Sequence, residues 1–247
     1  MARGPGLTLA IAQKRFPGNA LPLLTDFHLD IAPGSVVALH GPSGIGKSTL
    51  LRLVASIDRD YVGTVAMDGI PAAQAPPPGF VFQDARLLPW LSAADNIRVA
   101  APGLTPADAR AALARLGLAD HAAAWPRTLS GGMQRRVALA RALATNAGLL
   151  LLDEPFVSLD RALADDLRDR LADLVAATGA TVLFASHDPR DAARLADRVV
   201  TLAERPAQIA QDLTFAIPRA ARDAAIIADY GQQLIDPPPP ATSNTLR

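Results

Sequence analysis

The sequence predicts an α/β fold in which helices wrap a mixed sheet, with an inserted all-α subdomain and an N-terminal antiparallel β part. Strand-like runs alternate with helical spacing before residue 92 and again after residue 146, as expected for a sheet covered by helices. Residues 92–146 between them show helical spacing without a convincing strand. The 247 residues are enough for a full-sized core, because a chain of this length buries roughly 70% of its unfolded surface.

The first part of the chain is predicted to form five short strands, at residues 7–12, 26–31, 35–40, 62–67 and 79–82. The second of them alternates apolar and polar residues, as an edge strand does. A glycine-rich stretch, 41–46, follows the third strand and leads into helical spacing over 47–57. The proline-rich stretch 71–78 connects the last two strands and cannot lie inside a helix.

Helical spacing fills the middle of the chain, at residues 92–99, 106–116 and 131–144. The second of these helices is expected to start after the N-cap Thr105 and to stop at Gly117. Strands and helices then alternate, with strands at 149–152, 181–185 and 198–202 and helices at 161–177 and 189–196. This second alternation indicates that the helical stretch interrupts a single α/β core.

We expect one domain over residues 1–236. Its core comes from residues 1–91 and 147–205, and the helical subdomain 92–146 is inserted between these halves. Helical spacing near the end of the sequence predicts a C-terminal helix over about 218–235. Residues 237–247 open with four prolines, and we expect them to be disordered.

The composition excludes several classes of function. Cysteine is absent, which excludes disulfides, thiolate metal sites and a cysteine nucleophile. The 24 basic and 24 acidic residues balance, which argues against broad nucleic-acid binding through a basic face. The apolar runs fall far short of the roughly 18 residues that span a bilayer, and the N-terminal one is too short for a signal-peptide core. We therefore expect a soluble, cytoplasmic protein.

The glycine-rich stretch fits the phosphate-binding pattern G-x-x-x-x-G-K-[ST]. Glycines let backbone N–H groups converge on phosphates, and the helix that follows directs its positive end at the same anion. The lysine of the pattern reaches the terminal phosphates and the serine hydroxyl is placed to bind Mg²⁺. With the next residue, the candidate nucleotide-binding residues are Gly41, Pro42, Ser43, Gly44, Ile45, Gly46, Lys47, Ser48 and Thr49.

The alternative is a chance glycine turn before a helix. Against it, Lys47 is one of only two lysines among the 24 basic residues, so its place in the motif is informative. The predicted strand before the loop and the helix after it are the context that the motif requires.

A second motif has the properties needed to bind the metal. The apolar run 149–152 ends in Asp153 and Glu154. We expect Asp153 to lie beside the phosphate loop and hold Mg²⁺, and Glu154 to orient or deprotonate the attacking water. The alternative is that the two carboxylates only cap the next helix.

With four further motifs, the sequence resembles the ATP-binding cassette (ABC) ATPases over roughly residues 7–203. Residues 129–133, Leu-Ser-Gly-Gly-Met, are similar to the signature of the family. Gln83 matches the Q-loop, Ser158-Leu159-Asp160 the D-loop and His187 the switch histidine. All of these motifs stand in the order of the family.

The resemblance implies a P-loop NTPase core that binds ATP and Mg²⁺ and hydrolyses ATP. It implies a homodimer in which each signature closes on the γ-phosphate that the partner holds. Gln83 would then act in catalysis and contact Mg²⁺, and His187 would contact the γ-phosphate. Phe16 lies where the family places an aromatic residue that stacks on adenine, and Asp160 belongs to the nucleotide site.

Each of these assignments has a plainer alternative. Ser130, Gly131 and Gly132 open a helix, so they form either a second anion site or an ordinary glycine-containing N-cap. An isolated Gln83 is typical of plain surface, Asp160 can simply cap its helix, and Phe16 can be a packing residue. Met133 and Arg135 replace glutamines common in the family, but neither change affects the phosphate-binding residues.

The residues after Gln83 indicate the task of the ATPase. The stretch 82–92 resembles the Q-loop region of importers for nitrate, sulfonate and taurine, where a helix of a membrane permease docks. Its apolar side chains alternatively fill the core of the helical subdomain; they are Leu87, Leu88, Trp90 and Leu91. Since no span is expected here, the resemblance implies separate transmembrane permease subunits and an external solute-binding protein. The chain would lie peripherally on the inner face of the membrane and bind no nucleic acid.

Three other classes of protein are considered. A soluble ABC ATPase of DNA repair or translation usually has a long coiled-coil insertion or two cassettes, and neither is present here. A non-catalytic regulator would not need Lys47, Asp153, Glu154 and His187 together. A small-molecule kinase would not explain the signature. We therefore expect an importer ATPase.

Overall fold

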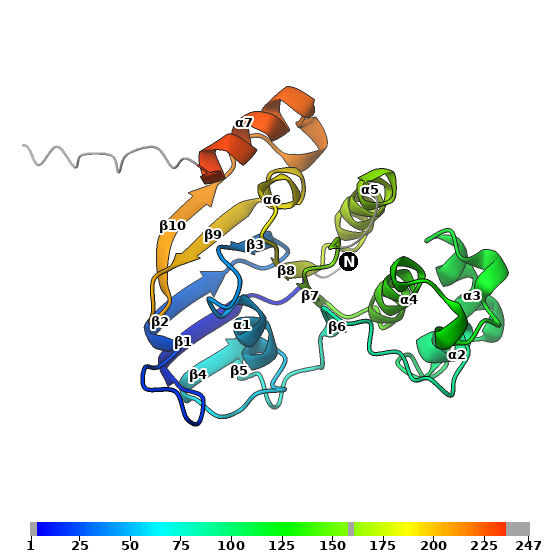
Figure 1. Cartoon of the computed structure of the whole chain (residues 1–247), viewed down its shortest axis with the longest axis horizontal. Helices are drawn as coiled ribbons and strands as arrows, with labels where there is room; N and C mark the ends of the chain where they lie inside the picture. The colour runs from blue at the N-terminus through cyan, green and yellow to red at the C-terminus, as the bar shows by residue number, and fades with distance from the viewer. Residues whose placement is uncertain (1–3, 158–160, 236–247) are drawn as a thin grey trace, which may run out of the picture.

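The computed structural model describes residues 4–157 and 161–235 and contains two sheets with helices around them (Figure 1). The smaller sheet is antiparallel, and its order is β2 (Leu24–Ile31), β1 (Leu7–Lys14), β4 (Val62–Met67) and β5 (Ile70–Pro71). The larger sheet has the order β10 (Gln208–Thr214), β9 (Arg198–Ala203), β3 (Val36–His40), β8 (Thr181–Ala185), β7 (Leu149–Asp153) and β6 (Gly79–Val81). Neighbouring strands of the larger sheet run parallel, except that β10 is antiparallel to β9. The predicted mixed sheet and antiparallel part are confirmed.

Residues of the inner strands alternate between two hydrophobic cores. In β3, Val36 and Ala38 belong to the core under the outer helices, whereas Val37 and Leu39 belong to the core shared with the small sheet. Strands β7 and β8 divide in the same way, which explains why they are apolar throughout. The helix α1 (Lys47–Val54) packs in the core that both sheets share.

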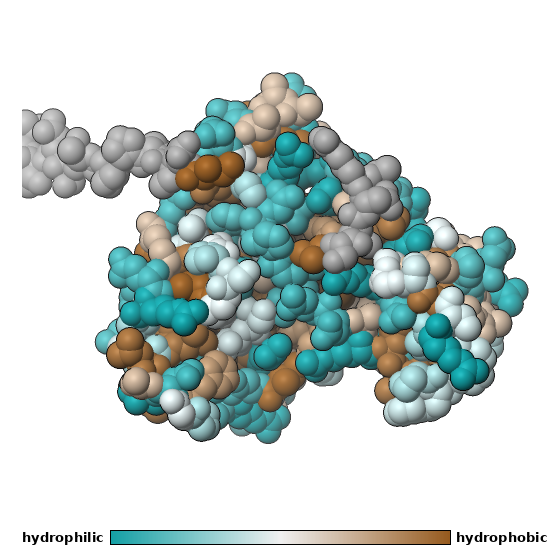
Figure 2. All heavy atoms as spheres, in the orientation of Figure 1, coloured by the Kyte–Doolittle hydropathy of each residue, from teal (hydrophilic) through white to brown (hydrophobic). Residues whose placement is uncertain are grey.

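Three helices form the inserted subdomain: α2 (Ala93–Arg98), α3 (Pro106–Ala114) and α4 (Gly131–Ala144). Each starts at a capping side chain, since Ser92, Thr105 and Ser130 accept hydrogen bonds from backbone N–H groups of the first turn; of these, Thr105 was predicted as an N-cap. Figure 1 shows this subdomain apart from α1, and Figure 2 shows it projecting from the body with a hollow at the lower edge of the view.

The remaining helices cover the outer face of the large sheet. They are α5 (Arg161–Thr178), α6 (Pro189–Leu195) and α7 (Ala224–Ile235). Residues of all three enter the core that lies under the outer helices. Within residues 4–157 and 161–235, no helix combines the length and apolar character that a bilayer crossing requires.

The structure departs from the predicted elements near the end of the chain. The strand β10 was not predicted, because none of its seven residues is fully buried and a register shift interrupts its pairing. The C-terminal helix was predicted from about residue 218, but a 3₁₀ turn, Arg219–Ala221, comes first and α7 starts at Ala224. Arg222 separates the two, because its guanidinium turns inward to the carbonyl oxygens of Ile217, Ala193 and Ala196. The tail 237–247 lies outside the described residues, and the domain boundaries stay a prediction.

Candidate nucleotide-binding site

The glycine-rich loop joins β3 to α1 at the carboxyl edge of the large sheet. Gly41 has a φ of +137°, and a Cβ there would lie 2.4 Å from the carbonyl oxygen of Leu202, so only glycine fits. Gly46 is the N-cap of α1 with a φ of +120°, and no side chain caps the helix. Since the first turn of α1 also has no acidic residue, its N–H groups are left for an external anion.

Lys47 folds back across this loop. Its Nζ donates hydrogen bonds to the carbonyl oxygens of Gly41, at 2.7 Å, and Pro42, at 3.1 Å, and lies 4.0 Å from Oε1 of Glu154. Burial lowers the pKa of Lys47, and the nearby carboxylates of Glu154 and Asp153 oppose that shift. The Lys47 ammonium is therefore held inside the loop by two backbone carbonyl oxygens and the nearby Glu154 carboxylate.

Ser48 and Asp153 form the pair that suits a magnesium ion. The Ser48 hydroxyl donates to Oδ1 of Asp153 at 2.8 Å, and Asp153 is 1% exposed. Within the described residues, its Oδ2 is buried without a hydrogen-bond partner, and burial raises the pKa of this carboxyl. Mg²⁺ prefers oxygen ligands, and one or two carboxylates usually hold it. The Ser48 hydroxyl and the Asp153 carboxylate, with one oxygen free of hydrogen bonds to the described residues, therefore fit the ion. No group of three or more His, Cys, Asp or Glu side chains in the described chain forms another metal site.

Glu154 and His187 are brought together by neighbouring strands. Glu154 has a φ of +50°, and its backbone N–H donates to the carbonyl oxygen of Ala185 at 3.0 Å. His187 follows β8, and its Nδ1 lies 2.9 Å from Oε2 of Glu154. The carboxylate is buried while the imidazole is more than half exposed, so the pair faces the surface through His187.

Gln83 lies two residues beyond the end of β6 and is exposed. Asn96, a fully buried residue of α2, holds the segment that follows Gln83 against the helical subdomain. The Asn96 amide binds the N–H and carbonyl of Leu88 and the carbonyls of Leu91 and Ser92. Sequence reasoning missed Asn96. The signal for it is a polar amide among the apolar residues of a predicted helix.

The apolar side chains of this segment divide between core and surface. Leu87 packs against the core, as the alternative reading of the sequence has it. Trp90 is 66% exposed, so packing does not explain it. Arg141 of α4 donates to the carbonyl oxygens of Ala85 and Arg86, which ties the same segment to the signature helix.

The signature residues lie at the start of α4. The Ser130 hydroxyl accepts a hydrogen bond from the N–H of Met133 at 3.3 Å, and Ser130 and Gly131 are exposed. Among the described residues, no hydrogen bond or ion pair joins this helix start to the glycine-rich loop. Gly132 is half-buried. Asp160 lies outside the described residues.

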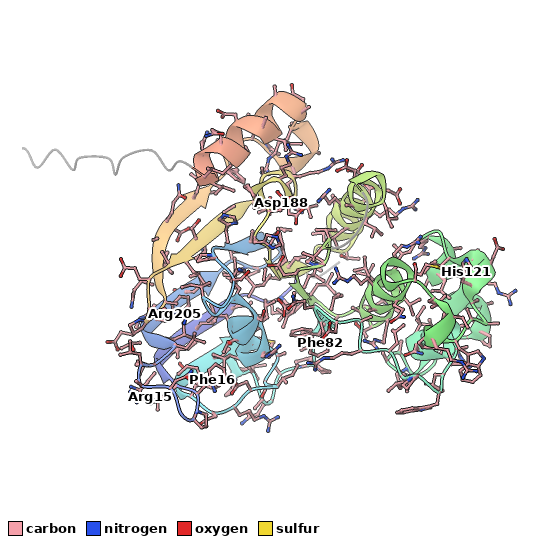
Figure 3. All side chains as sticks on the ribbon, in the orientation of Figure 1. Arg15, Phe16, Phe82, His121, Asp188 and Arg205 are labelled. Carbon is pink, nitrogen blue, oxygen red and sulfur yellow. The ribbon has the colours of Figure 1, made fainter. Side chains whose placement is uncertain are left out.

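Phe16 lies in the loop between β1 and β2, on the surface (Figure 3). It is 36% exposed and does not belong to either core. The buried ammonium of Lys14 lies 4.7 Å from its ring centroid and forms an ion pair with Asp58 at 2.8 Å. Sequence reasoning missed this role of Lys14, and the contact of Phe16 with adenine stays a prediction.

Known families and their members match most of the chain. The profile of the family described as ABC transporter matches residues 24–157, more than half of the chain, and an AAA-domain profile matches the shorter stretch 125–190. "Aliphatic sulfonates import ATP-binding protein SsuB 1" of Xanthomonas axonopodis pv. citri (strain 306) is 45% identical over 222 residues, 87% of each chain. The SsuB protein of Escherichia coli (strain K12) is 42% identical over 221 residues, 89% of this chain and 85% of that protein.

Solved structures show the same architecture. A dimeric ATP-binding cassette in a post-hydrolysis state, bound to ADP and Pi, superposes with a TM-score of 0.76 at 28% identity and covers 85% of this chain and 98% of that one. A bacterial Atm1-family ABC exporter with ATP bound gives a TM-score of 0.77 at 25% identity, over 95% of this chain and 43% of that one. With the phosphate loop, the carboxylate pair and the signature helix in place, the chain belongs to the ABC transporter family and is an ATP-hydrolysing ABC cassette.

Proposed function

We propose that the chain is the ATPase subunit of an importer for small sulfonates, in which two copies close head to tail around two ATP and drive a separate membrane permease. The observation that carries this proposal is the division of phosphate-binding groups between two subdomains. Lys47, Ser48 and the Glu154–His187 pair lie together on the core, whereas the open helix start at Ser130 has no phosphate-binding partner on its own subdomain. A second copy in the opposite orientation supplies that partner.

The core residues bind and align ATP. Backbone N–H groups of residues 43–49 and the Lys47 ammonium bind the phosphates, and Lys47 exchanges its two carbonyl partners for phosphate oxygens. Ser48, Asp153 and Gln83 would hold Mg²⁺, which supplies positive charge to the phosphate oxygens when bound.

Hydrolysis requires an activated water at the γ-phosphate. The Glu154 carboxylate is already oriented by its 2.9 Å contact with His187, so it accepts a proton from the attacking water. His187 is exposed enough to contact the γ-phosphate at the same time. Phe16 contributes a free ring face for adenine, opposite the Lys14 ammonium.

The partner copy completes the site. The N–H groups at the helix start of Ser130, Gly131 and Gly132 bind the γ-phosphate held by the other copy, and Asp160 belongs to the same nucleotide site. Relatives named as sulfonate import proteins support the cargo class, and the solved cassette dimer supports the pairing.

The permease docks where the structure exposes an apolar side chain beside the Q-loop. Trp90 lies on the segment 83–92, which Asn96 and Arg141 tie to the helical subdomain. A movement of the docked permease is therefore transmitted to Gln83 and to α4. In this proposal the chain lies on the cytoplasmic face of the membrane, a solute-binding protein acts on the other side, and there is no nucleic-acid partner.

Affinity purification from detergent-solubilised membranes tests the importer assignment. We expect the tagged chain to retain a multispanning permease, the variant Trp90→Ala to lose it, and Ile57→Ala to keep it. Ile57 is a matched control, because its apolar side chain is also exposed, at 52%, but it follows α1 and does not belong to the segment 83–92. Recovery of a soluble partner or nucleic acid instead would favour the soluble ABC ATPase.

Growth tests the cargo. A strain that lacks the chain should lose growth on an alkanesulfonate as sole sulfur source and keep growth on sulfate. If growth on every sulfonate tested were unchanged, the cargo would not be a sulfonate, but the assignment as an ATPase would be unaffected.

A further inference from the structure

Arg205 reaches the phosphate loop from the turn between β9 and β10 (Figure 3). Its Nη2 donates a hydrogen bond to the carbonyl oxygen of Gly44 at 3.1 Å, across 161 residues of sequence. Within the described part of the chain, Arg205 has no carboxylate within ion-pair distance. The guanidinium is therefore committed to a backbone carbonyl of the loop that is expected to hold the phosphates.

The turn that presents Arg205 is anchored on its other side. Ala207 is fully buried, its N–H donates to the carbonyl oxygen of Leu23 at 2.8 Å, and it forms an isolated bridge with Leu24. Leu23 in turn lies against Gly46, where a Cβ would be 3.3 Å from it. The turn, the small sheet and the phosphate loop thus contact one another, and the anchored backbone of the turn holds the exposed Arg205 beside the loop.

The hydrogen bond fixes the orientation of one peptide. The Gly44–Ile45 peptide is trans, so its C=O and N–H groups point in opposite directions. The carbonyl faces Arg205, and the N–H of Ile45 faces the interior of the loop, 3.4 Å from the carbonyl oxygen of Pro42. The same Pro42 oxygen accepts a hydrogen bond from Lys47, so this N–H and the lysine converge on one point.

We propose that Arg205 is a positioning residue for nucleotide binding. Its hydrogen bond to Gly44 holds the peptide with the N–H of Ile45 directed at the phosphates, in a loop whose N–H groups cradle them. Without this bond, the peptide at Gly44 turns more freely, because glycine allows both signs of φ and has a φ of +77° here. The inference rests on the proposed role of the loop as the phosphate site.

Nucleotide affinity and steady-state kinetics test this role. For Arg205→Ala we expect ATP and ADP, each with Mg²⁺, to bind about fivefold more weakly, as for the loss of one typical net hydrogen bond at an exposed position. The KM for ATP should rise by the same factor, while kcat stays within about twofold of wild type, because Glu154 and His187 are untouched. Arg205→Lys, which keeps a charged donor, should recover most of the affinity.

Salt concentration separates geometry from simple charge. The Debye length falls from about 10 Å at 0.1 M to about 3 Å at 1 M, so a long-range attraction by the Arg205 charge would disappear at 1 M salt. The effect of Arg205→Ala should instead persist at 1 M. Wild-type affinity for this variant, or a loss that disappears at 1 M salt, would overturn the proposal.

Two further variants keep this result distinct from the proposed function. Arg110→Ala removes an exposed arginine of α3, far along the chain from the loop, and should bind ATP as wild type does. Lys47→Ala should lose binding. If Lys47→Ala bound ATP normally, the assignment of the loop itself would be wrong. If Arg205→Ala bound ATP normally but Lys47→Ala did not, the assignment of the loop as the phosphate site would hold, and the positioning role of Arg205 would be wrong.

Discussion

The core half of the site and the signature half are built in opposite ways. In the core, Lys47, Ser48 and Glu154 each already have a polar partner in the same chain. At the signature, Ser130 and Gly131 are exposed, and the Ser130 hydroxyl caps its own helix by accepting a hydrogen bond from the N–H of Met133. One half is arranged before the nucleotide arrives, whereas the other is complete only when something else closes on it.

The helix starts differ in whether their first turn carries a carboxylate. The first turns of α2, α3 and α6 contain an aspartate, at Asp95, Asp108 and Asp191, whereas those of α1 and α4, like those of α5 and α7, contain no acidic residue. A carboxylate in the first turn partly neutralises the positive helix end. The two helix starts proposed to bind phosphate are therefore left without such a competitor, although they belong to different subdomains.

The largest effect is expected from Glu154→Gln in the core. The glutamine keeps the size of the side chain but cannot accept the proton of the attacking water, so hydrolysis should fall by about 10²–10⁴-fold. ATP binding should remain, since the phosphate contacts of Lys47 and Ser48 are unchanged, and ATP-bound dimers should accumulate. Turnover and sizing chromatography with ATP measure both effects. If Glu154→Gln hydrolysed ATP at the wild-type rate, Glu154 would not be the group that activates the water, and the proposed catalytic role of the core would be wrong.

Ser130→Arg tests the other half. We expect hydrolysis to fall by about 10²-fold or more, because the arginine fills the space that the γ-phosphate of the partner must enter. Nucleotide binding by the isolated monomer should not change. The matched control is Thr105→Arg, which also replaces an exposed N-cap of the helical subdomain and should cost only stability, about 1 kcal/mol. Loss of binding by the Ser130→Arg monomer would mean that Ser130 acts within its own chain.

One glycine from each half of the site, Gly41 and Gly131, is replaced by alanine to compare a tightly packed position with an open one. Gly41→Ala should destabilise the fold by about 2–4 kcal/mol, since its Cβ would meet the Leu202 carbonyl oxygen at a φ that favours glycine. At Gly131, no atom lies within 4 Å of the added Cβ, so Gly131→Ala should leave the unfolding midpoint in urea unchanged. It should still reduce hydrolysis, because the partner approaches this helix start. Equal stability losses at both positions would contradict the comparison.

Sequence reasoning was most successful where the site is local in the chain. The loop 41–48 and the strand before Asp153 are each contiguous in the sequence, so residue type and period predict both elements. The place of Asp153 beside the loop, 105 residues away, was expected from the phosphate-binding pattern and not from local spacing. The contact of Arg205 with Gly44 spans 161 residues and depends on β10, which has no apolar face that a sequence pattern would reveal. The burial of Lys14 likewise depends on Asp58, which only the folded chain brings near.

The smallest expected effect is a pH dependence confined to α3. Hydrogen bonds from the Thr105 hydroxyl and backbone N–H lower the pKa of Asp108 below its ordinary 3.8. A depressed pKa means that this stabilisation is fully present above the unfolded-state value and is lost as pH falls through the folded-state value. Asp108→Asn should therefore lower Tm slightly at pH 7, and the difference from wild type should shrink below about pH 4. An unchanged difference would show that the capping box does not depend on the charge of Asp108, and α3 would then lose its contrast with the starts of α1 and α4, which contain no acidic residue.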